Sequence, residues 1–154
     1  MIIYTDGSCR KNGDLANSSG GYAVVVLDDN QNLITTYAHQ EHGTTNNRQE
    51  LKAILYTMLV YGSKDPGDIP LVYSDSAYCV QTFNDWMWKW ARNNWLKSND
   101  RPPENLDLIK AYYDHYMKGY RIDLQKVAGH SGNKWNELAD ALACGRTTTH
   151  EVKI

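Results

Sequence analysis

Four acidic residues stand in sequence contexts that suit a metal site: Asp6 in YTDGSC, Glu50 in TTNNRQEL, Asp75 in VYSDS and Asp140 in GHSGNKWNELAD. Asp6 and Asp75 end short apolar runs, whereas Glu50 and Asp140 lie in amphipathic segments. Four carboxylates in one pocket repel one another strongly, and hard divalent cations such as Mg²⁺ relieve that repulsion. Pairs of such ions favour in-line displacement at phosphorus. The pattern therefore predicts metal-dependent phosphodiester chemistry on nucleic acid.

Taken singly, each acid also has a purely structural explanation. An aspartate at the end of a strand often caps a turn, and a glutamate in the first turn of a helix favours the helix dipole. Asp140 fits the solvated surface of a helix equally well. The functional interpretation therefore depends on whether the fold brings the four acids together.

Strand and helix signals predict an α/β domain with a mixed five-stranded sheet flanked by helices. β-branched and aromatic residues predict strands at residues 1–6, 22–27, 33–42, 71–74 and 121–127. Periodicity and capping residues predict a helix that follows the caps at residues 45–47 and closes at Gly62, and further helices at residues 76–85, 106–117 and 136–144, with an irregular segment at 86–105. The first three strands would form an antiparallel meander, and the first and fourth would be parallel, joined by a right-handed crossover. Asp6 and Asp75 would then end adjacent strands, where open α/β sheets bind ligands, and Glu50 would reach the same point.

The bulk composition is that of one cytoplasmic domain. The chain has 154 residues and a formal net charge of -2, so any nucleic acid would have to be bound by local patches. Cys9, Cys79 and Cys144 form no paired motif, which indicates a reducing compartment. No signal peptide and no membrane-spanning run is expected. We expect a monomer with one domain over residues 1–145 and a loose tail over residues 146–154.

Together these motifs resemble those of type 1 ribonuclease H, the ribonuclease HI family. The resemblance runs from Met1 to about Gly145, and it includes the glycine pair at 20–21 and a tryptophan-rich segment at 86–95. It implies a ribonuclease H-like fold, in which three antiparallel and two further parallel strands are flanked by helices and by a basic protrusion rich in tryptophan. It also implies an endonuclease that hydrolyses the RNA strand of RNA–DNA hybrids and leaves 5′-phosphate and 3′-hydroxyl ends.

The resemblance also implies roles for individual residues. Asp6, Glu50, Asp75 and Asp140 would hold two Mg²⁺ ions at the scissile phosphate, one to activate the attacking water and one to stabilise the leaving 3′ oxygen. Mn²⁺ accepts the same oxygen ligands and would substitute. His130, in the loop GHSG, would assist proton handling or the release of product or metal, a task that suits imidazole near neutral pH. Without the family context, His130 would be taken for an exposed loop residue.

A ribonuclease H must distinguish RNA from DNA, and the 2′-hydroxyl is the backbone group that differs. Residues that have suitable hydrogen-bonding chemistry, or that match substrate-contacting positions of the family, are Ser8, Cys9, Asn12, Thr45, Asn46, Asn47 and Gln49. The backbone at Ser8 and Cys9 would face the ribose, and Thr45 would lie near a phosphate of the DNA strand. Asn46 and Asn47 would serve equally well as helix caps.

Residues 86–101 carry four of the five tryptophans, and four basic residues against one acid. Such a segment suits phosphate contact through its cations and sugar or base contact through its rings. Trp86 and Trp90 are four residues apart and are expected to pin a protruding helix to the body, which leaves Trp95 as the predicted substrate contact. The predicted backbone contacts are Lys89, Arg92, Lys97 and, by resemblance, Asn105.

Two departures from the family pattern affect the predicted contacts. The loop RKNGDLANSS is longer than usual and lacks Asn-Pro-Gly, which leaves the position of Asn12 open. Ala77 stands where many members carry a polar side chain, so one substrate contact is expected to be missing.

Two alternative functions remain open at this stage. A non-catalytic hybrid-binding module would use the same groove, but it has no need for four mutually repelling acids. A strand-transfer or resolvase nuclease would need further DNA-binding or oligomerisation parts, and no separate hybrid-binding domain is expected in the chain.

Overall fold

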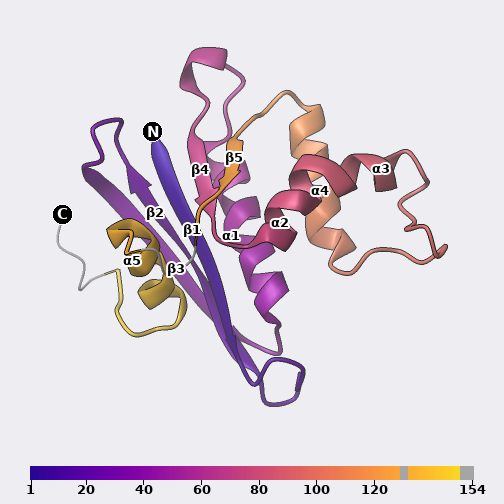
Figure 1. Ribbon diagram of the computed structural model, residues 1–154, viewed down its shortest axis with the longest axis horizontal. Coiled ribbons are helices and arrows are strands. Elements are labelled where there is room, and N and C mark those ends of the chain that lie inside the picture. The colour runs from indigo at the N-terminus through magenta and orange to yellow at the C-terminus, as the bar shows by residue number, and fades with distance from the viewer. Residues whose placement is uncertain (129–131, 150–154) are drawn as a thin grey trace.

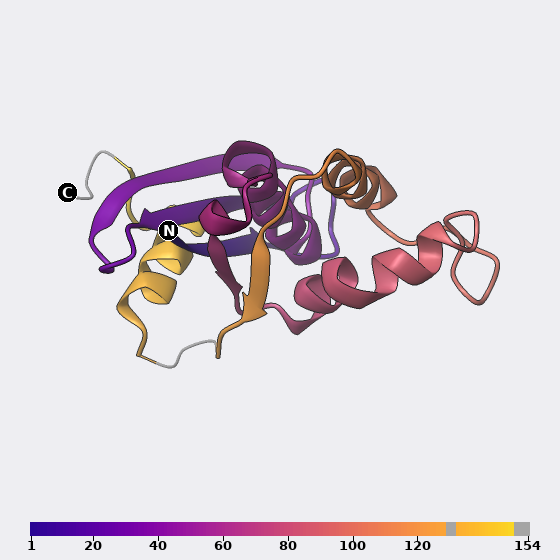
Figure 2. The same cartoon turned by 90° about the horizontal axis from the view of Figure 1, so that it is seen from above.

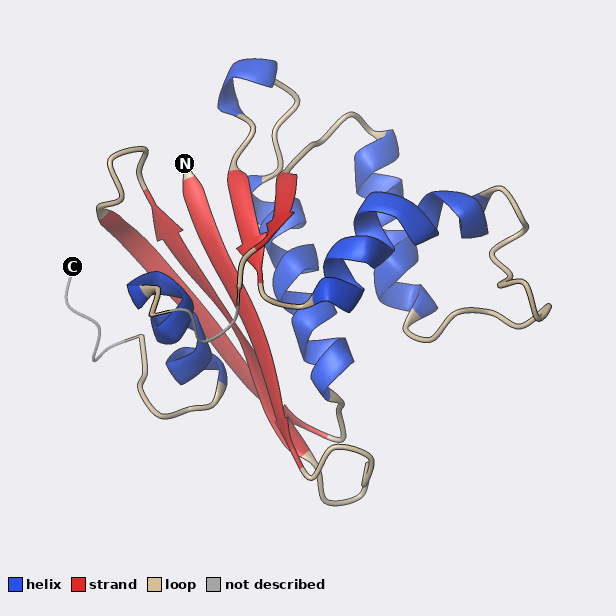
Figure 3. Ribbon diagram, viewed as in Figure 1, coloured by secondary structure: helices blue, strands red, loops and turns tan. Residues whose placement is uncertain are grey.

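The computed structural model describes residues 1–128 and 132–149. Five strands form one mixed sheet in the order β3-β2-β1-β4-β5. Their bounds are Ile2–Arg10 for β1, Ser19–Leu27 for β2, Leu33–His42 for β3, Leu71–Ser74 for β4 and Asp123–Lys126 for β5. β1, β2 and β3 are antiparallel neighbours, whereas β4 pairs in parallel with both β1 and β5. The predicted sheet is confirmed (Figure 3).

Helices connect and cover these strands. Their bounds are Asn46–Tyr61 for α1, Pro66–Asp68 for the 3-10 turn η1, Ala77–Gln81 for α2, Thr82–Trp86 for the π-helical segment η2, Met87–Ala91 for α3, Leu106–Met117 for α4 and Lys134–Ala143 for α5. Side chains cap several of their first turns, as expected for free backbone N–H groups. Thr45 accepts from the Arg48 N–H, Ser76 from the Cys79 N–H, and Asn133 from the Trp135 and Asn136 N–H groups. Among the described residues, no helix is long and apolar enough to span a bilayer.

The sheet separates two apolar layers. Because side chains alternate along a strand, Ile3 and Val24 face one side, and Tyr4 and Val25 face the other. The first pair packs in the larger core with residues of α1, α2 and α4, and the second pair packs with α5. Figures 1 and 2 show α5 alone on its face of the sheet, opposite α1. Helices on both faces of the sheet can therefore bring side chains to the ends of its central strands.

The strand ends differ from the sequence-based prediction at one hairpin. β1 does not end at Asp6 but continues to Arg10, because Gly7–Arg10 pair with Ser19–Tyr22 of β2. The connection between the first two strands is correspondingly shorter than predicted, and β2 begins at Ser19 instead of Tyr22. Asp6 nevertheless lies where the parallel pairing of β1 with β4 stops, since the last pair of that ladder is Thr5 with Ser74.

The predicted helix at 76–85 is longer than expected. α2, η2 and α3 follow one another without a gap over residues 77–91, so the first part of the segment predicted to be irregular, residues 86–91, is helical. α3 and the following loop extend away from the sheet (Figure 1). Trp88 attaches this helical run to α4, because its ring meets the Tyr116 ring edge-on at 4.8 Å and the Tyr113 ring at 5.5 Å.

Candidate active site

The sheet places Asp6 and Asp75 side by side. Thr5 of β1 and Ser74 of β4 form the last pair of the parallel ladder. Asp6 directly follows Thr5, and Asp75 directly follows Ser74. Asp6 is 3% exposed, and Asp75 is half-buried. The two aspartates therefore lie where the parallel pairing of β1 and β4 ends, and the carboxyl ends of parallel strands are where such sheets bind ligands.

Glu50 reaches these aspartates from the first turns of α1. The start of this helix is fixed twice, by the Thr45 cap and by Asn12, whose Oδ1 accepts a hydrogen bond from the Asn46 N–H at 3.1 Å. The helix then runs along the larger core, where Leu51 and Ile54 are fully buried. These contacts direct Glu50 toward the sheet edge.

Carboxylate oxygens of Asp6, Glu50 and Asp75 all lie within 4.8 Å of one another. Burial, together with the charge of Asp75, raises the pKa of Asp6 to about 7. Burial and the neighbouring Asp6 also raise the pKa of Glu50 well above its ordinary value. Among the described residues, buried Glu50 Oε2 has no hydrogen-bond partner. An arrangement of crowded, desolvated oxygens is what a hard divalent cation requires, so the donor set fits Mg²⁺ or Mn²⁺.

Asp140 approaches the same pocket from α5, on the other face of the sheet. Its Oδ2 accepts a hydrogen bond from Arg146 Nη2 at 2.6 Å, and its Oδ1 faces the Cys144 thiol at 3.6 Å. Burial acts to raise the pKa of Asp140, but the Arg146 guanidinium and the other hydrogen bonds outweigh it and hold the pKa below its usual range. The predicted loose tail is therefore anchored at its first residue.

The four acids line one open cavity of about 470 Å³. Its other lining residues are Gly7, Ser8, Asn46, Asn47 and Ser76. The two asparagines are exposed at the start of α1, and the Ser8 hydroxyl accepts a hydrogen bond from the Cys144 thiol at 3.2 Å. The carboxylates in this cavity are thus surrounded by short polar side chains that can donate and accept hydrogen bonds.

Other predicted contacts lie near this cavity without lining it. Gln49 is fully buried, where its amide donates to Glu41 and to Thr44 at 2.6 Å each. The Cys9 thiol donates to the Thr44 carbonyl at 3.4 Å. Asn105 lies at the start of α4, and its Oδ1 accepts from Arg48 at 3.2 Å. His130 lies outside the described residues.

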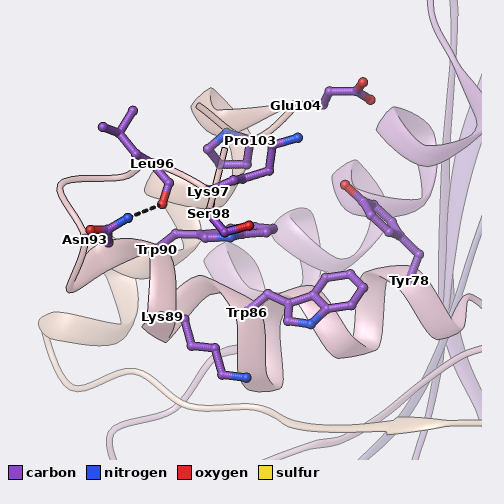
Figure 4. Close-up of a pocket in the computed structure, with 10 residues that line it drawn as sticks. All are labelled: Tyr78, Trp86, Lys89, Trp90, Asn93, Leu96, Lys97, Ser98, Pro103 and Glu104. Atoms are coloured by element: carbon purple, nitrogen blue, oxygen red, sulfur yellow. Dashed lines mark hydrogen bonds between the residues drawn. The ribbon is translucent and has the colours of Figure 1, made fainter. Parts of the chain in front are cut away.

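A second cavity, of about 650 Å³, lies beside the helical run 77–91. Its lining residues are Tyr78, Trp86, Lys89, Trp90, Asn93, Leu96, Lys97, Ser98, Pro103 and Glu104, and Figure 4 shows the rings of Tyr78, Trp86 and Trp90 turned toward this space. Trp86 and Trp90 thus line a cavity, whereas the sequence pattern assigned them to packing, although Trp90 also packs partly against the core. Trp95 instead meets Tyr113 edge-on at 5.0 Å and lies under Lys110.

Tyr78, which lines the second cavity, and Arg146, which contacts Asp140, were not singled out from the sequence. Tyr78 precedes Trp86 and Trp90 by eight and twelve positions, which do not share a face on a regular α-helix, and its ring meets Trp86 only because the π-helical segment η2 lies between them. Arg146 is six residues beyond Asp140, too far for a neighbour on one regular helix. It faces Asp140 only because the chain turns back at the end of α5.

Comparison with known proteins agrees with this geometry. The RNase H family model matches residues 1–147. A curated ribonuclease H of Caldanaerobacter subterraneus subsp. tengcongensis is 40% identical over 149 residues, which cover 96% of this chain and 91% of the relative. A ribonuclease H of a Thermoanaerobacter species is 41% identical over 143 residues, covering 92% of this chain and 85% of the relative.

Solved structures share the fold. The crystal structure of LC9-RNase H1, a type 1 RNase H, matches with a TM-score of 0.70 and 27% identity, over 92% of this chain and 69% of that one. LC11-RNase H1, solved in complex with an RNA/DNA hybrid, matches with a TM-score of 0.66 and 20% identity, over 97% and 96% of the two chains. The family match over residues 1–147 and the relatives of about 40% identity show that the chain belongs to the ribonuclease H family.

Proposed function

We propose that this enzyme hydrolyses the RNA strand of RNA–DNA hybrids with two Mg²⁺ ions and leaves 5′-phosphate and 3′-hydroxyl ends. The observation that carries the proposal is the convergence of the Asp6, Glu50 and Asp75 oxygens within 4.8 Å in a cavity that Asp140 also lines. The proposed ligands are these four acids. Mn²⁺ takes the same oxygen donors and is expected to replace Mg²⁺.

The carboxylates fit this role because they are costly to leave without cations. Burial and mutual repulsion raise the pKa of Asp6 and of Glu50, so the ionised carboxylates destabilise the folded protein when no cation is bound. When bound, the ions would lower the pKa of the attacking water and stabilise charge on the phosphate and leaving oxygen. The rigid sheet and the capped helix α1 fix the ligands before substrate arrives, which limits reorganisation during the reaction.

The rim of the cavity supplies the selection for RNA. Ser8, Asn46 and Asn47 offer groups that donate and accept hydrogen bonds beside the carboxylates. A ribose 2′-hydroxyl can be both donor and acceptor, and deoxyribose lacks it. We assign these three residues to the RNA strand, with the backbone at Cys9 and the Asn12 side chain beside them. Gln49 is assigned a supporting role, because its buried amide holds the start of α1 to Thr44.

The second cavity suits the other strand of the hybrid. Lys89 and Lys97 line it together with the rings of Trp86 and Trp90, and cations beside ring faces accommodate phosphates next to sugars or bases (Figure 4). Thr45 and Asn105 are the predicted contacts to the DNA strand, and Arg92 and Trp95 are further predicted substrate contacts. The hybrid complex of LC11-RNase H1 supports a hybrid as the ligand of this fold.

His130 is assigned to proton handling or to release of product or metal, from its motif GHSG. His130→Ala should slow turnover on the order of 10- to 100-fold, within the range of acid–base help. A loss as complete as that caused by Asp6→Asn would contradict a supporting role.

The function is tested by incubating the protein with labelled RNA–DNA hybrid, duplex RNA and duplex DNA, with and without Mg²⁺. Cleavage of the hybrid alone, dependent on the ion, is expected, and the 5′ ends are then checked for phosphate. Binding without cleavage would favour a non-catalytic module, and cleavage of duplex DNA would favour a strand-transfer nuclease. Asp6→Asn should bind hybrid at least as tightly as wild type and cleave none of it.

A further inference from the structure

Asp140, the acid that α5 contributes to the pocket, has a guanidinium in direct contact. Arg146 Nη2 lies 2.6 Å from Asp140 Oδ2, within the range of a strong charge-assisted hydrogen bond. The second oxygen, Oδ1, is turned toward the Cys144 thiol. Of the two oxygens that a metal ion could use, Oδ2 is therefore engaged by the guanidinium, whereas Oδ1 has only a long contact with a thiol that also lies 3.2 Å from the Ser8 hydroxyl.

The position of Arg146 is built into the end of α5. The Gly145 N–H donates to the Leu142 carbonyl at 3.2 Å, and the Arg146 N–H donates to the Ala141 carbonyl at 2.9 Å. Gly145 has a φ of 75°, the left-handed conformation that glycine adopts readily. This pair of hydrogen bonds is the Schellman motif, which turns the chain back over the last helical turn. Arg146 is thus directed toward Asp140 by the backbone.

α5 itself is tied to the sheet next to this turn. The Gln40 amide of β3 donates to the Leu142 and Ala143 carbonyls at 3.3 and 3.0 Å. A Cβ on Gly21 of β2 would lie 2.6 Å from the Ala143 carbonyl oxygen, so helix and sheet are in close contact. The end of α5 cannot shift far, and its cation stays beside the pocket.

We infer that Arg146 is an internal counter-cation that competes with the divalent metal for Asp140. In the metal-free protein it neutralises the fourth carboxylate and keeps its oxygen occupied. A metal ion that takes Asp140 as a ligand has to share the carboxylate with the guanidinium or displace it, so the ion pair weakens metal binding at this ligand. Arg146 is then a positioning residue that acts through Asp140 and sets the metal concentration at which the site fills. The inference rests on the proposed metal site of Asp6, Glu50 and Asp75.

The test measures metal binding without substrate. Mn²⁺ is titrated into metal-free wild type, Arg146→Gln and Arg146→Lys at fixed ionic strength, and free Mn²⁺ is followed by electron paramagnetic resonance. Arg146→Gln should lower the half-saturating Mn²⁺ concentration roughly two- to fivefold, the range that a half-exposed ion pair supports. Arg146→Lys keeps the charge and should bind nearly as wild type does. An unchanged or higher value for Arg146→Gln would overturn the inference.

A double-mutant comparison separates competition at Asp140 from a general change of charge. In the Asp140→Asn background, Arg146→Gln should change the half-saturating concentration little, because the carboxylate for which the two cations compete is gone. The control Lys118→Gln removes the same charge from an exposed position at the end of α4. Equal tightening in Lys118→Gln, or undiminished tightening in the Asp140→Asn background, would overturn the inference alone. Absence of saturable Mn²⁺ binding by wild type would overturn the inference and the proposed function together.

Discussion

Gly7 of β1 and Glu50 of α1 are in such close contact that a Cβ on Gly7 would lie 2.2 Å from the Glu50 backbone nitrogen. No side chain fits in this space, because real Cβ atoms do not approach backbone so closely. The contact brings a helix that covers one face of the sheet directly against the strand that carries Asp6. Gly7 therefore allows α1 to approach β1 closely enough for the carboxylates of Asp6 and Glu50 to be neighbours.

Gly7→Ala should separate Glu50 from Asp6 and strongly reduce turnover. Because the clash is with backbone, α1 has to move, which is expected to cost about 1–3 kcal/mol of unfolding free energy. Activity should fall at least tenfold, with a higher Mg²⁺ requirement, as measured by steady-state kinetics on a labelled hybrid. Gly67→Ala is the matched control, since its Cβ would meet nothing nearer than 3.5 Å. Wild-type kinetics in Gly7→Ala would show that the close contact does not control the site.

The metal-free protein should lose stability as the pH rises from about 4 to about 7. Burial and the charge of Asp75 raise the pKa of Asp6 from 3.8 to about 7, so in this window the folded state binds more protons than the unfolded state. Unfolding free energy falls with pH wherever the folded state holds the extra proton. Saturating Mg²⁺ should oppose the decline, because the ion binds the ionised, folded form.

Asp6→Asn tests this assignment directly. Each pKa unit corresponds to about 1.4 kcal/mol, so the variant should be more stable than metal-free wild type at pH 7 by roughly 1–3 kcal/mol and should have a shallower pH slope. Urea unfolding at several pH values measures both quantities. Asp114→Asn, an exposed change of the same kind on α4, should leave the slope as it is. A steeper slope in Asp6→Asn would contradict the raised pKa.

Lys89→Gln and Lys97→Gln should weaken hybrid binding through the second cavity. Each lysine that contacts a phosphate contributes about one unit to the slope of log affinity against log salt concentration. Each variant should raise KM several-fold, change kcat little and make that slope shallower by about one. Lys118→Gln serves as the control for net charge. An unaltered salt slope in both variants would place the DNA strand elsewhere.

Arg48→Gln should loosen the attachment of α4 to α1. Arg48 donates to both Asp107 oxygens, at 3.1 and 2.8 Å, and to Asn105 Oδ1 at 3.2 Å, so one side chain holds the first turn of α4. The exposed ion pair and the hydrogen bond together are expected to contribute about 1 kcal/mol. Urea unfolding checks this value against Arg101→Gln, an exposed arginine. Arg48→Lys should recover only part of it, because lysine lacks the planar fork.

The acidic site could be predicted from the sequence because strand register follows local patterns. The apolar runs before Asp6 and Asp75 make them neighbours once the two strands are parallel, and the α1 capping signal fixes where Glu50 falls. The prediction of the end of β1 was wrong, because Gly7–Arg10 are small or polar and read as a turn. They are held in the sheet by pairing with β2, a tertiary interaction that overrides local preference.

The second cavity and the Arg146 contact could not be predicted in the same way. The helix through residues 82–91 continues past a π-helical turn, which shifts the helical periodicity and hides the shared face of Tyr78 and Trp86. Arg146 meets Asp140 through a turn whose geometry depends on Gly145. Sequence motifs identified the acids that cluster, whereas the groups that contact those acids are placed by turns and packing.

The placement of α1 and α5 on opposite faces of the sheet makes hydrolysis depend on an intact fold. If α5 separated from the sheet while the larger core stayed folded, Asp140 would leave the acidic pocket, and Asp6, Glu50, Asp75 and the second cavity would stay in place. Such a molecule would still bind a hybrid but would not cleave it. Partial unfolding would therefore convert the enzyme into a competitive inhibitor of its own intact copies.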